Sequence, residues 1–135
     1  MKKMISLTFL FFIVISCSAC GKGNVFFVKK NIPAANTYTE KEIRNAMHIV
    51  VNEFHDEFKG CTLRELRYDE AWSNDQKKFW EDQYLADEAI VLLSTFKTDS
   101  KGGDGSFAPD SVYEDWNWIL VRDHNNDWKL KTWGY

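Results

Sequence analysis

The feature that most constrains the fold is a capped, one-sided helix pattern that follows residue 38. Thr39 and Glu42 have the spacing of a capping box, in which each side chain accepts a hydrogen bond from the other residue's backbone amide. Apolar side chains then recur at helical spacing: Ile43, Ala46, Met47, Val50, Phe54 and Phe58. Gly60 ends the pattern. A helix of roughly 20 residues with one apolar face must bury that face against another element.

That other element is predicted to be a β-sheet. Alternating or β-favouring stretches occupy 61–69, 89–98, 112–122 and 128–133, and the Asn-Asn-Asp tripeptide before the last of them signals a tight hairpin. A second, shorter helix is predicted over 72–84 from its aromatic spacing. This order predicts an α+β domain in which a long N-terminal helix and a short second helix cover one face of a bent antiparallel sheet of about four strands.

The first 20 residues predict a targeting segment. Lys2 and Lys3 form a basic start, and the apolar run over 4–15 is shorter than the roughly 20 residues of a membrane-spanning helix. Cys17 and Cys20 follow directly, which favours a lipoprotein signal with one of them as the lipid attachment site; an ordinary secretory signal is the alternative. The chain then divides into a signal peptide and lipobox, a tether and a single globular domain, at 1–20, 21–37 and 38–135.

The net charge of the chain limits the classes of partner that are expected. The chain has 17 basic and 20 acidic side chains, and loss of Lys2 and Lys3 with the signal lowers its net charge from −3 to −5. Without a basic cluster to neutralise phosphates, nucleic acid is not an expected partner. Attachment to the membrane should therefore come from the N-terminal lipid, a diacylglycerol thioether with fatty acyl chains such as palmitate. The expected location is the outer face of the cytoplasmic membrane, in the cell envelope. No cofactor is predicted.

Cys61 has two possible roles. If Cys17 carries the lipid, Cys20 and Cys61 both remain in an oxidising compartment and could form a disulfide. If Cys20 carries the lipid, Cys61 is left alone and is predicted to be a small buried hydrophobic residue.

Several short motifs carry a resemblance to a protein family. They are FKGCTL at 58–63, YDE at 68–70, GGDGS at 102–106, Tyr113 with WNWILVR at 116–122, and WGY at 133–135. In these motifs, from about residue 38 to the end, the chain resembles a family of uncharacterised lipoproteins of Gram-positive bacteria, a domain of unknown function. The resemblance implies a nuclear-transport-factor-like, cystatin-like fold, in which a bent sheet wraps a long helix to form a cone. It implies no activity, and it favours packing over pairing for Cys61.

Aromatic residues supply the candidate ligand-binding site. Trp116 and Trp118 project from the same face of one predicted strand. If that face points inward, the mouth of the cone is lined by Tyr68, Trp72, Trp80, Trp116 and Trp118. Such a lining suits a flat, apolar or sugar-like ligand. The alternative is that these rings fill the core of a small domain.

Catalytic and metal-binding signals are weaker. Asp69 as a base and Tyr68 as a hydrogen-bond donor are the acid/base candidates, since enzymes of cone-shaped folds bury such a pair. Strand alternation places the two on opposite faces, however. His48 and His55 are seven residues apart on the first helix, too far along it to favour one metal, so none is predicted. The glycine-rich stretch that starts at Asp99 reads as a flap, a binding loop or a compact surface loop.

The sequence therefore predicts a lipid-anchored, extracytoplasmic binding or accessory module. Its ligand would be a small apolar molecule, a cell-wall fragment or a peptide. Two alternatives remain open: a small hydrolase or isomerase that uses Asp69 and Tyr68, and a protein–protein interaction domain that presents its sheet. An enzyme is the less favoured of these readings.

Overall fold

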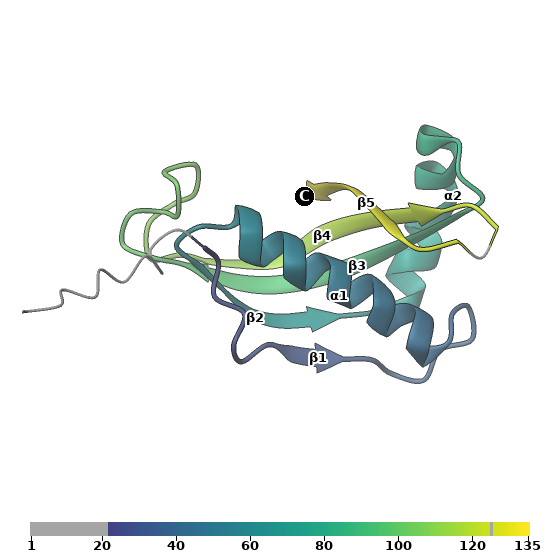
Figure 1. Cartoon of the computed structure of the whole chain (residues 1–135), viewed down its shortest axis with the longest axis horizontal. Helices are drawn as coiled ribbons and strands as arrows, with labels where there is room; N and C mark the ends of the chain where they lie inside the picture. Colours follow the sequence, from purple (N-terminus) through teal and green to yellow (C-terminus); the bar gives the residue numbers. More distant parts are fainter. Residues whose placement is uncertain (1–21, 125) are drawn as a thin grey trace, which may run out of the picture.

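The computed structural model describes residues 22–124 and 126–135. Its elements are β1 (Lys29–Asn31), α1 (Glu40–Glu57), β2 (Cys61–Arg67), α2 (Glu70–Tyr84), β3 (Glu88–Thr98), β4 (Val112–Arg122) and β5 (Lys129–Gly134). The strands form one sheet in the order β1-β2-β3-β4-β5, with β3 and β4 as its long central strands (Figure 1). The predicted α+β class, with two helices on a sheet, is confirmed.

Three details of the predicted sheet and helix order are wrong. The sheet has five strands rather than about four, and it is mixed, because β1 pairs in parallel with β2 whereas the other neighbours are antiparallel. Since β1 precedes α1, the longer helix is also not the N-terminal element. The extra strand has the sequence Lys-Lys-Asn and is exposed throughout, so it carries no alternation by which it could be predicted.

The segment before α1 packs on the domain. Lys29 and Asn31 lie beside Glu65 and Arg67 of β2, while four apolar side chains of the segment pack against the core: Val25, Val28, Ile32 and Ala35. Strand β1 directly follows the apolar run 25–28, and the first and last residues of that run, Val25 and Val28, pack against the core. Residues 22–37 therefore run along the edge of the sheet for most of their length (Figure 1).

Helix α1 begins as its sequence predicts. The Glu42 amide donates to Thr39 Oγ1 at 3.3 Å, and the Thr39 amide donates to Glu42 Oε2 at 2.7 Å, so both bonds of the capping box are present. The apolar stripe faces the sheet, and Phe58 follows the last turn as the C-cap. The main core lies between α1 and the sheet and consists of Tyr38, Ile43, Ala46, Met47, Val50, Phe54, Phe58, Cys61, Leu63, Leu66, Tyr68, Ile90, Leu92, Phe96, Trp118, Leu120 and Trp128.

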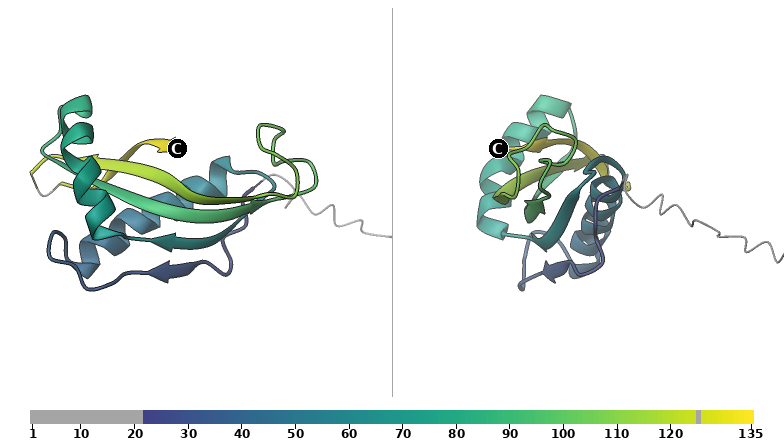
Figure 2. Two further views of the ribbon diagram at one scale, coloured as in Figure 1. Left: turned by 180° about the vertical axis from the view of Figure 1, so that it is seen from behind. Right: turned by 90° about the vertical axis from the view of Figure 1, so that its left-hand side faces the viewer.

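The two helices lie on opposite faces of the sheet, so the prediction that they cover one face is wrong. The two views of Figure 2 place α2 on one side of the strands and α1 on the other. The Val91 amide donates to Ser73 Oγ of α2 at 3.0 Å, and Ile90 and Leu92 point into the α1 core. The reason lies in β3, whose residues Ala89–Leu93 are all buried. A strand buried on both sides needs a cover on both sides.

Candidate functional site

The interior predicted as a ligand cone is filled by side chains. Trp118 is fully buried, and its indole N–H donates to Ser94 Oγ at 2.8 Å. Its ring centroid lies 5.1 Å from that of Phe58. Tyr68 is 2% exposed in the same core, and burial raises the pKa of its phenol. The structure therefore places Tyr68 and Trp118 where the alternative reading expects them, in the packed core.

Trp116 belongs to an aromatic cluster at one end of the same face. Its ring centroid lies 5.5 Å from that of Phe96, 5.8 Å from that of Phe107 and 5.1 Å from that of Tyr135. Phe107 is part of the glycine-rich loop, so the cluster fixes that loop against the end of the sheet. Trp116 is half-buried there and is separated by the sheet from α2.

An open aromatic groove lies on the opposite face, between α2 and the β4–β5 edge. It has a volume of about 340 Å³ and is lined by Trp72, Gln76, Trp80, Asn117, Ile119, Thr132, Trp133, Gly134 and Tyr135. We call it the α2 groove. Two of the five predicted ligand-binding residues, Trp72 and Trp80, line this groove. The five residues therefore do not line one cavity, because the sheet lies between the two sets.

Hydrogen bonds fix the exposed indole of the α2 groove. Trp72 is 41% exposed, yet its indole N–H donates to Asn117 Oδ1 at 2.8 Å. The Asn117 amide donates in turn to the carbonyl of Gly134 at 3.3 Å, which ties the groove wall to β5. Trp80 stacks on Tyr84, with 6.0 Å between ring centroids. Contacts within the protein thus hold both tryptophan rings in place.

The side chains that line the α2 groove carry no charge. Its polar side chains are the amides of Gln76 and Asn117 and the hydroxyl of Thr132, while Tyr135 borders the groove with its ring packed on Trp116. An uncharged lining suits a neutral ligand better than an ionic one. Seven of the nine lining residues were not predicted from the sequence, although one signal was available: Asn117 and Ile119 alternate with the tryptophans of β4 and so point to the other face.

The acid/base candidates lie on different sides of the sheet. Asp69 caps α2, because its Oδ1 accepts from the Trp72 amide at 3.0 Å. It borders a second hollow of about 200 Å³ that shares Trp72 as a wall with the α2 groove and contains an ion pair between Arg67 and Asp115. Tyr68 points into the α1 core instead. The structure therefore does not bring Asp69 and Tyr68 into one pocket.

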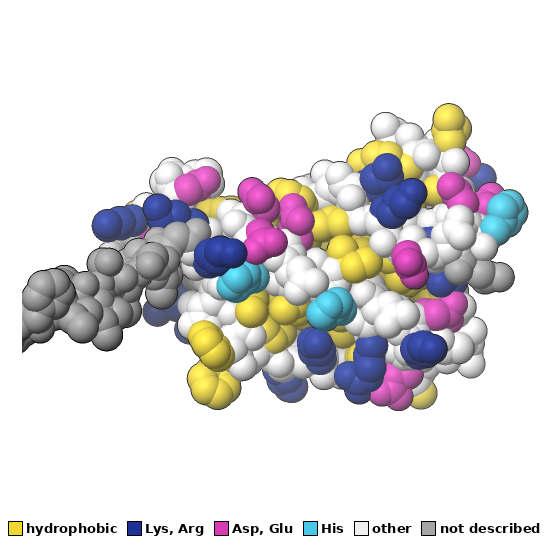
Figure 3. All heavy atoms as spheres, viewed as in Figure 1, with side chains coloured by type: hydrophobic (Ala, Val, Ile, Leu, Met, Phe, Trp, Pro, Cys, Tyr) yellow, Lys and Arg dark blue, Asp and Glu magenta, His cyan; other side chains and the backbone are white. Residues whose placement is uncertain are grey.

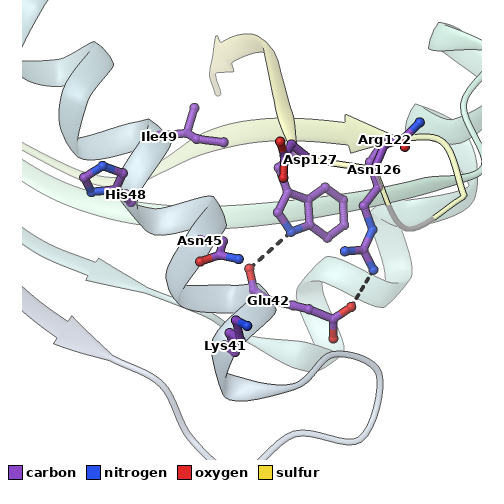
Figure 4. A pocket seen from close by; sticks show the side chains of 9 residues that line it. Lys41, Glu42, Asn45, His48, Ile49, Arg122, Asn126 and Asp127 are labelled. Atoms are coloured by element: carbon purple, nitrogen blue, oxygen red, sulfur yellow. Dashed lines mark hydrogen bonds and ion pairs between the residues drawn. The ribbon is translucent and has the colours of Figure 1, made fainter.

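A further hollow lies between α1 and the β4–β5 turn, with a volume of about 610 Å³ (Figure 4). Its wall is an ion-pair network. The Arg122 side chain is 7% exposed, donates to Glu42 Oε1 and Glu88 Oε2 at 2.6 Å each, and lies 4.2 Å above the Trp128 ring. The bond from Arg122 lowers the pKa of Glu42. These groups satisfy one another, which is typical of a structural network rather than of groups that await a substrate.

Metal-binding and membrane-spanning features are absent from the part of the chain that the structure describes. His48 Nε2 lies 3.3 Å from the Asn52 amide nitrogen, and His55 Nδ1 lies 3.0 Å from Asp56 Oδ1. Over residues 22–124 and 126–135, no three His, Cys, Asp or Glu side chains gather as metal ligands. None of the helices in these ranges is long and apolar enough to cross a membrane.

The glycine-rich loop uses its carboxylates within its own turns. Asp99 Oδ1 accepts from the amides of Gly103 and Lys101 at 3.0 Å each, and these bonds lower the pKa of Asp99. Asp104 Oδ1 accepts from the Ser106 amide at 2.9 Å. Of the three readings of this loop, the compact surface loop agrees best with these contacts.

Cys61 is 2% exposed, and within the described residues it is unpaired. The candidate lipid attachment sites Cys17 and Cys20 lie outside the described residues. Burial raises the pKa of the Cys61 thiol to about 11, and the nearby carboxylates of Asp99 and Asp104 add to this effect.

We expect Cys61 to resist alkylation by iodoacetamide at pH 8 while the protein is folded. The reactive thiolate is scarce three pH units below its pKa of about 11, and the sulfur is shielded. Peptide mass spectrometry would separate Cys61 from the N-terminal cysteines. Full modification in denaturant is the positive control, and equally fast modification of the native protein would contradict the prediction.

Comparisons with known proteins identify no relative. No protein-family model, no curated protein and no solved structure gives a significant match to this chain. The resemblance to the uncharacterised lipoprotein family therefore stays a prediction.

Proposed function

We propose that this protein is a lipid-anchored, extracytoplasmic binding module that holds a neutral glycan, such as a fragment of the cell wall, in the α2 groove. The observation that carries the proposal is that aromatic and uncharged polar side chains line that groove. Sugar rings have apolar faces and neutral hydroxyl edges. Aromatic rings offer a matching apolar surface, and side-chain amides and hydroxyls can bond the edges.

Preorganisation supports binding by this groove. A ligand gains most from a site whose side chains lose little freedom on binding. The bond from Trp72 to Asn117 and the stacking of Trp80 on Tyr84 hold both rings in place. Figure 1 shows α2 at the opposite end of the sheet from the point where the described chain begins, so the α2 wall of the groove would lie far from an N-terminal anchor.

The lipid anchor is the second part of the proposal, and it is supported by the sequence of residues 1–20. Mass spectrometry of the mature N-terminus from the native host tests it. A diacylglycerol on Cys17 or Cys20 supports the anchor, whereas an unmodified N-terminus overturns it.

We also propose that the domain is a variant of the cystatin-like architecture. In its favour, α1 packs across one face of the sheet, and β2, β3, β4 and β5 form a continuous antiparallel meander. A solved structure compared with cystatin-like domains would test this assignment. A topology in which α1 does not pack on the meander would contradict it.

Replacement of Trp72 by alanine should weaken glycan binding at least about tenfold, because exposed aromatic anchors dominate such sites. The probe would be soluble oligomers of N-acetylglucosamine, titrated while tryptophan fluorescence is recorded. Phe27→Ala is the matched control, since it removes an aromatic ring that is 94% exposed and lies outside the groove. Unchanged affinity in Trp72→Ala, or no binding by the unmodified protein, would contradict the proposal.

A further inference from the structure

Phe26 and Phe27 are the most exposed aromatic pair of the described chain. Their exposed fractions are 87% and 94%, although neighbouring Val25 and Val28 pack against the core. Figure 3 shows hydrophobic side chains that project at the end of the molecule where the described chain begins. Two large apolar rings held fully in water are unfavourable unless they have a partner.

The loop that carries the two rings is fastened on both sides. Before it, the Gly23 amide donates to the His55 carbonyl at 2.9 Å, and the Asn24 amide donates to the Cys61 carbonyl at 2.8 Å. Within it, the Phe26 amide donates to Asn24 Oδ1 at 3.0 Å. After it, β1 pairs with β2. The rings are therefore presented by the fold and are not part of a loose tail.

The surroundings of the two rings are basic, in contrast to the chain as a whole. Residues 22–39 contain Lys22, Lys29 and Lys30 and no acidic residue, although the chain has 20. Lys22 pairs with Asp56 at 3.4 Å, whereas Lys29 and Lys30 form no ion pair within the described residues. In the adjoining strand β2, Arg64 and Glu65 carry opposite charges and Arg67 is paired with Asp115, so Lys29 and Lys30 supply the excess positive charge. The local charge therefore favours an anionic partner.

We propose that Phe26 and Phe27 insert into the interfacial layer of an anionic bilayer while Lys29 and Lys30 contact its headgroups. The inference rests on the membrane anchoring proposed above. Cys20 precedes Phe26 by six residues, which span about 20 Å at most, so a lipid on this cysteine holds the rings beside the bilayer. Apolar insertion with basic flanks adds a second attachment to the lipid and fixes the orientation of the domain.

The test uses the full chain expressed in its host, with p-benzoylphenylalanine in place of Phe27. Illumination of isolated membranes should give lipid adducts at this position, several-fold more than at Leu85 substituted in the same way. Leu85 is a suitable control because it is 91% exposed and follows α2, at the other end of the sheet. The inference would be overturned if the probe gave no lipid adducts at either position, or if the probe at position 27 formed adducts with a protein instead.

A second variant tests the role of the two lysines. A separate measurement distinguishes failure of the proposed lipid anchor from failure of ring insertion. Lys29→Glu combined with Lys30→Glu should reduce the lipid adducts several-fold in vesicles that contain phosphatidylglycerol; an unchanged yield would contradict the role of the lysines. If mass spectrometry shows no N-terminal lipid, the anchoring proposal fails. Sedimentation of that unlipidated protein with phosphatidylglycerol vesicles then tests whether the two rings insert into the bilayer. Binding that depends on Phe26 and Phe27 supports insertion, and absence of binding overturns it.

Discussion

Replacement of Trp118 by alanine is expected to lower the free energy of unfolding by about 4 kcal/mol, as for other large-to-small changes in a core. Its side chain is fully buried between Phe58 and the strands, and its removal leaves a cavity. It also deprives the buried hydroxyl of Ser94 of the bond from the indole. Both effects act in the same direction.

Urea unfolding followed by circular dichroism measures this loss. Trp72→Ala is the matched control, because the same substitution at a 41% exposed indole should cost only about 2 kcal/mol, from its bond to Asn117 and the buried part of its ring. If Trp118→Ala unfolded at the same urea concentration as the unmodified protein, the site would be a pocket wall rather than core. The two variants together therefore test whether Trp118 belongs to the packed core.

Replacement of Arg122 by alanine is expected to cost about 3 kcal/mol, at the lower end of values for broken buried pairs because both carboxylates are partly exposed. The guanidinium joins Glu42 of α1 to Glu88 of β3 and packs over Trp128. Its removal leaves the two carboxylates without their shared cation. Arg44→Ala is the control, since its exposed pair with Glu40 is worth roughly 0.4 kcal/mol.

The same network predicts acid sensitivity. The bond from Arg122 lowers the pKa of Glu42 in the folded protein, so the unfolded chain binds this proton more readily. The stabilisation is complete above the unfolded value of about 4.3 and is lost as the pH falls through the lower folded value. Unfolding free energies measured from pH 7 to pH 3 should fall more steeply for the unmodified protein than for Arg122→Ala. Parallel curves would contradict the prediction.

Local signals in the sequence predicted most of the helices and strands. The capping box fixed the start of α1, and the alternation over 112–122 coincides with β4. The sequence pattern could not supply β1, because three polar residues at an edge carry no periodic signal. The placement of α2 was recoverable in principle, since the unbroken apolar run of β3 requires cover on both faces.

The site was predictable only in part for a related reason. The same aromatic residue types occur in cores and in binding grooves. In this protein, the face of the sheet on which a ring lies decides which of the two it belongs to. Trp72 and Trp80 line the α2 groove because they belong to α2, whereas Trp118 faces the core because of its phase in β4. Alternation along β4 correctly predicted that Trp116 and Trp118 share one face of the sheet. It could not predict that α2 would place Trp72 and Trp80 on the other face.

The parallel seam between the N-terminal segment and β2 has a mechanical consequence. Asn24 bridges Thr62, and Lys29–Asn31 runs beside Glu65–Arg67 in the same direction. A pull on Lys22 along the strand axis therefore strains these contacts together, in shear, rather than peeling them apart one after another. A domain tethered at this end to a membrane would transmit the drag of a bound glycan through the edge of its sheet, and the seam would share that load.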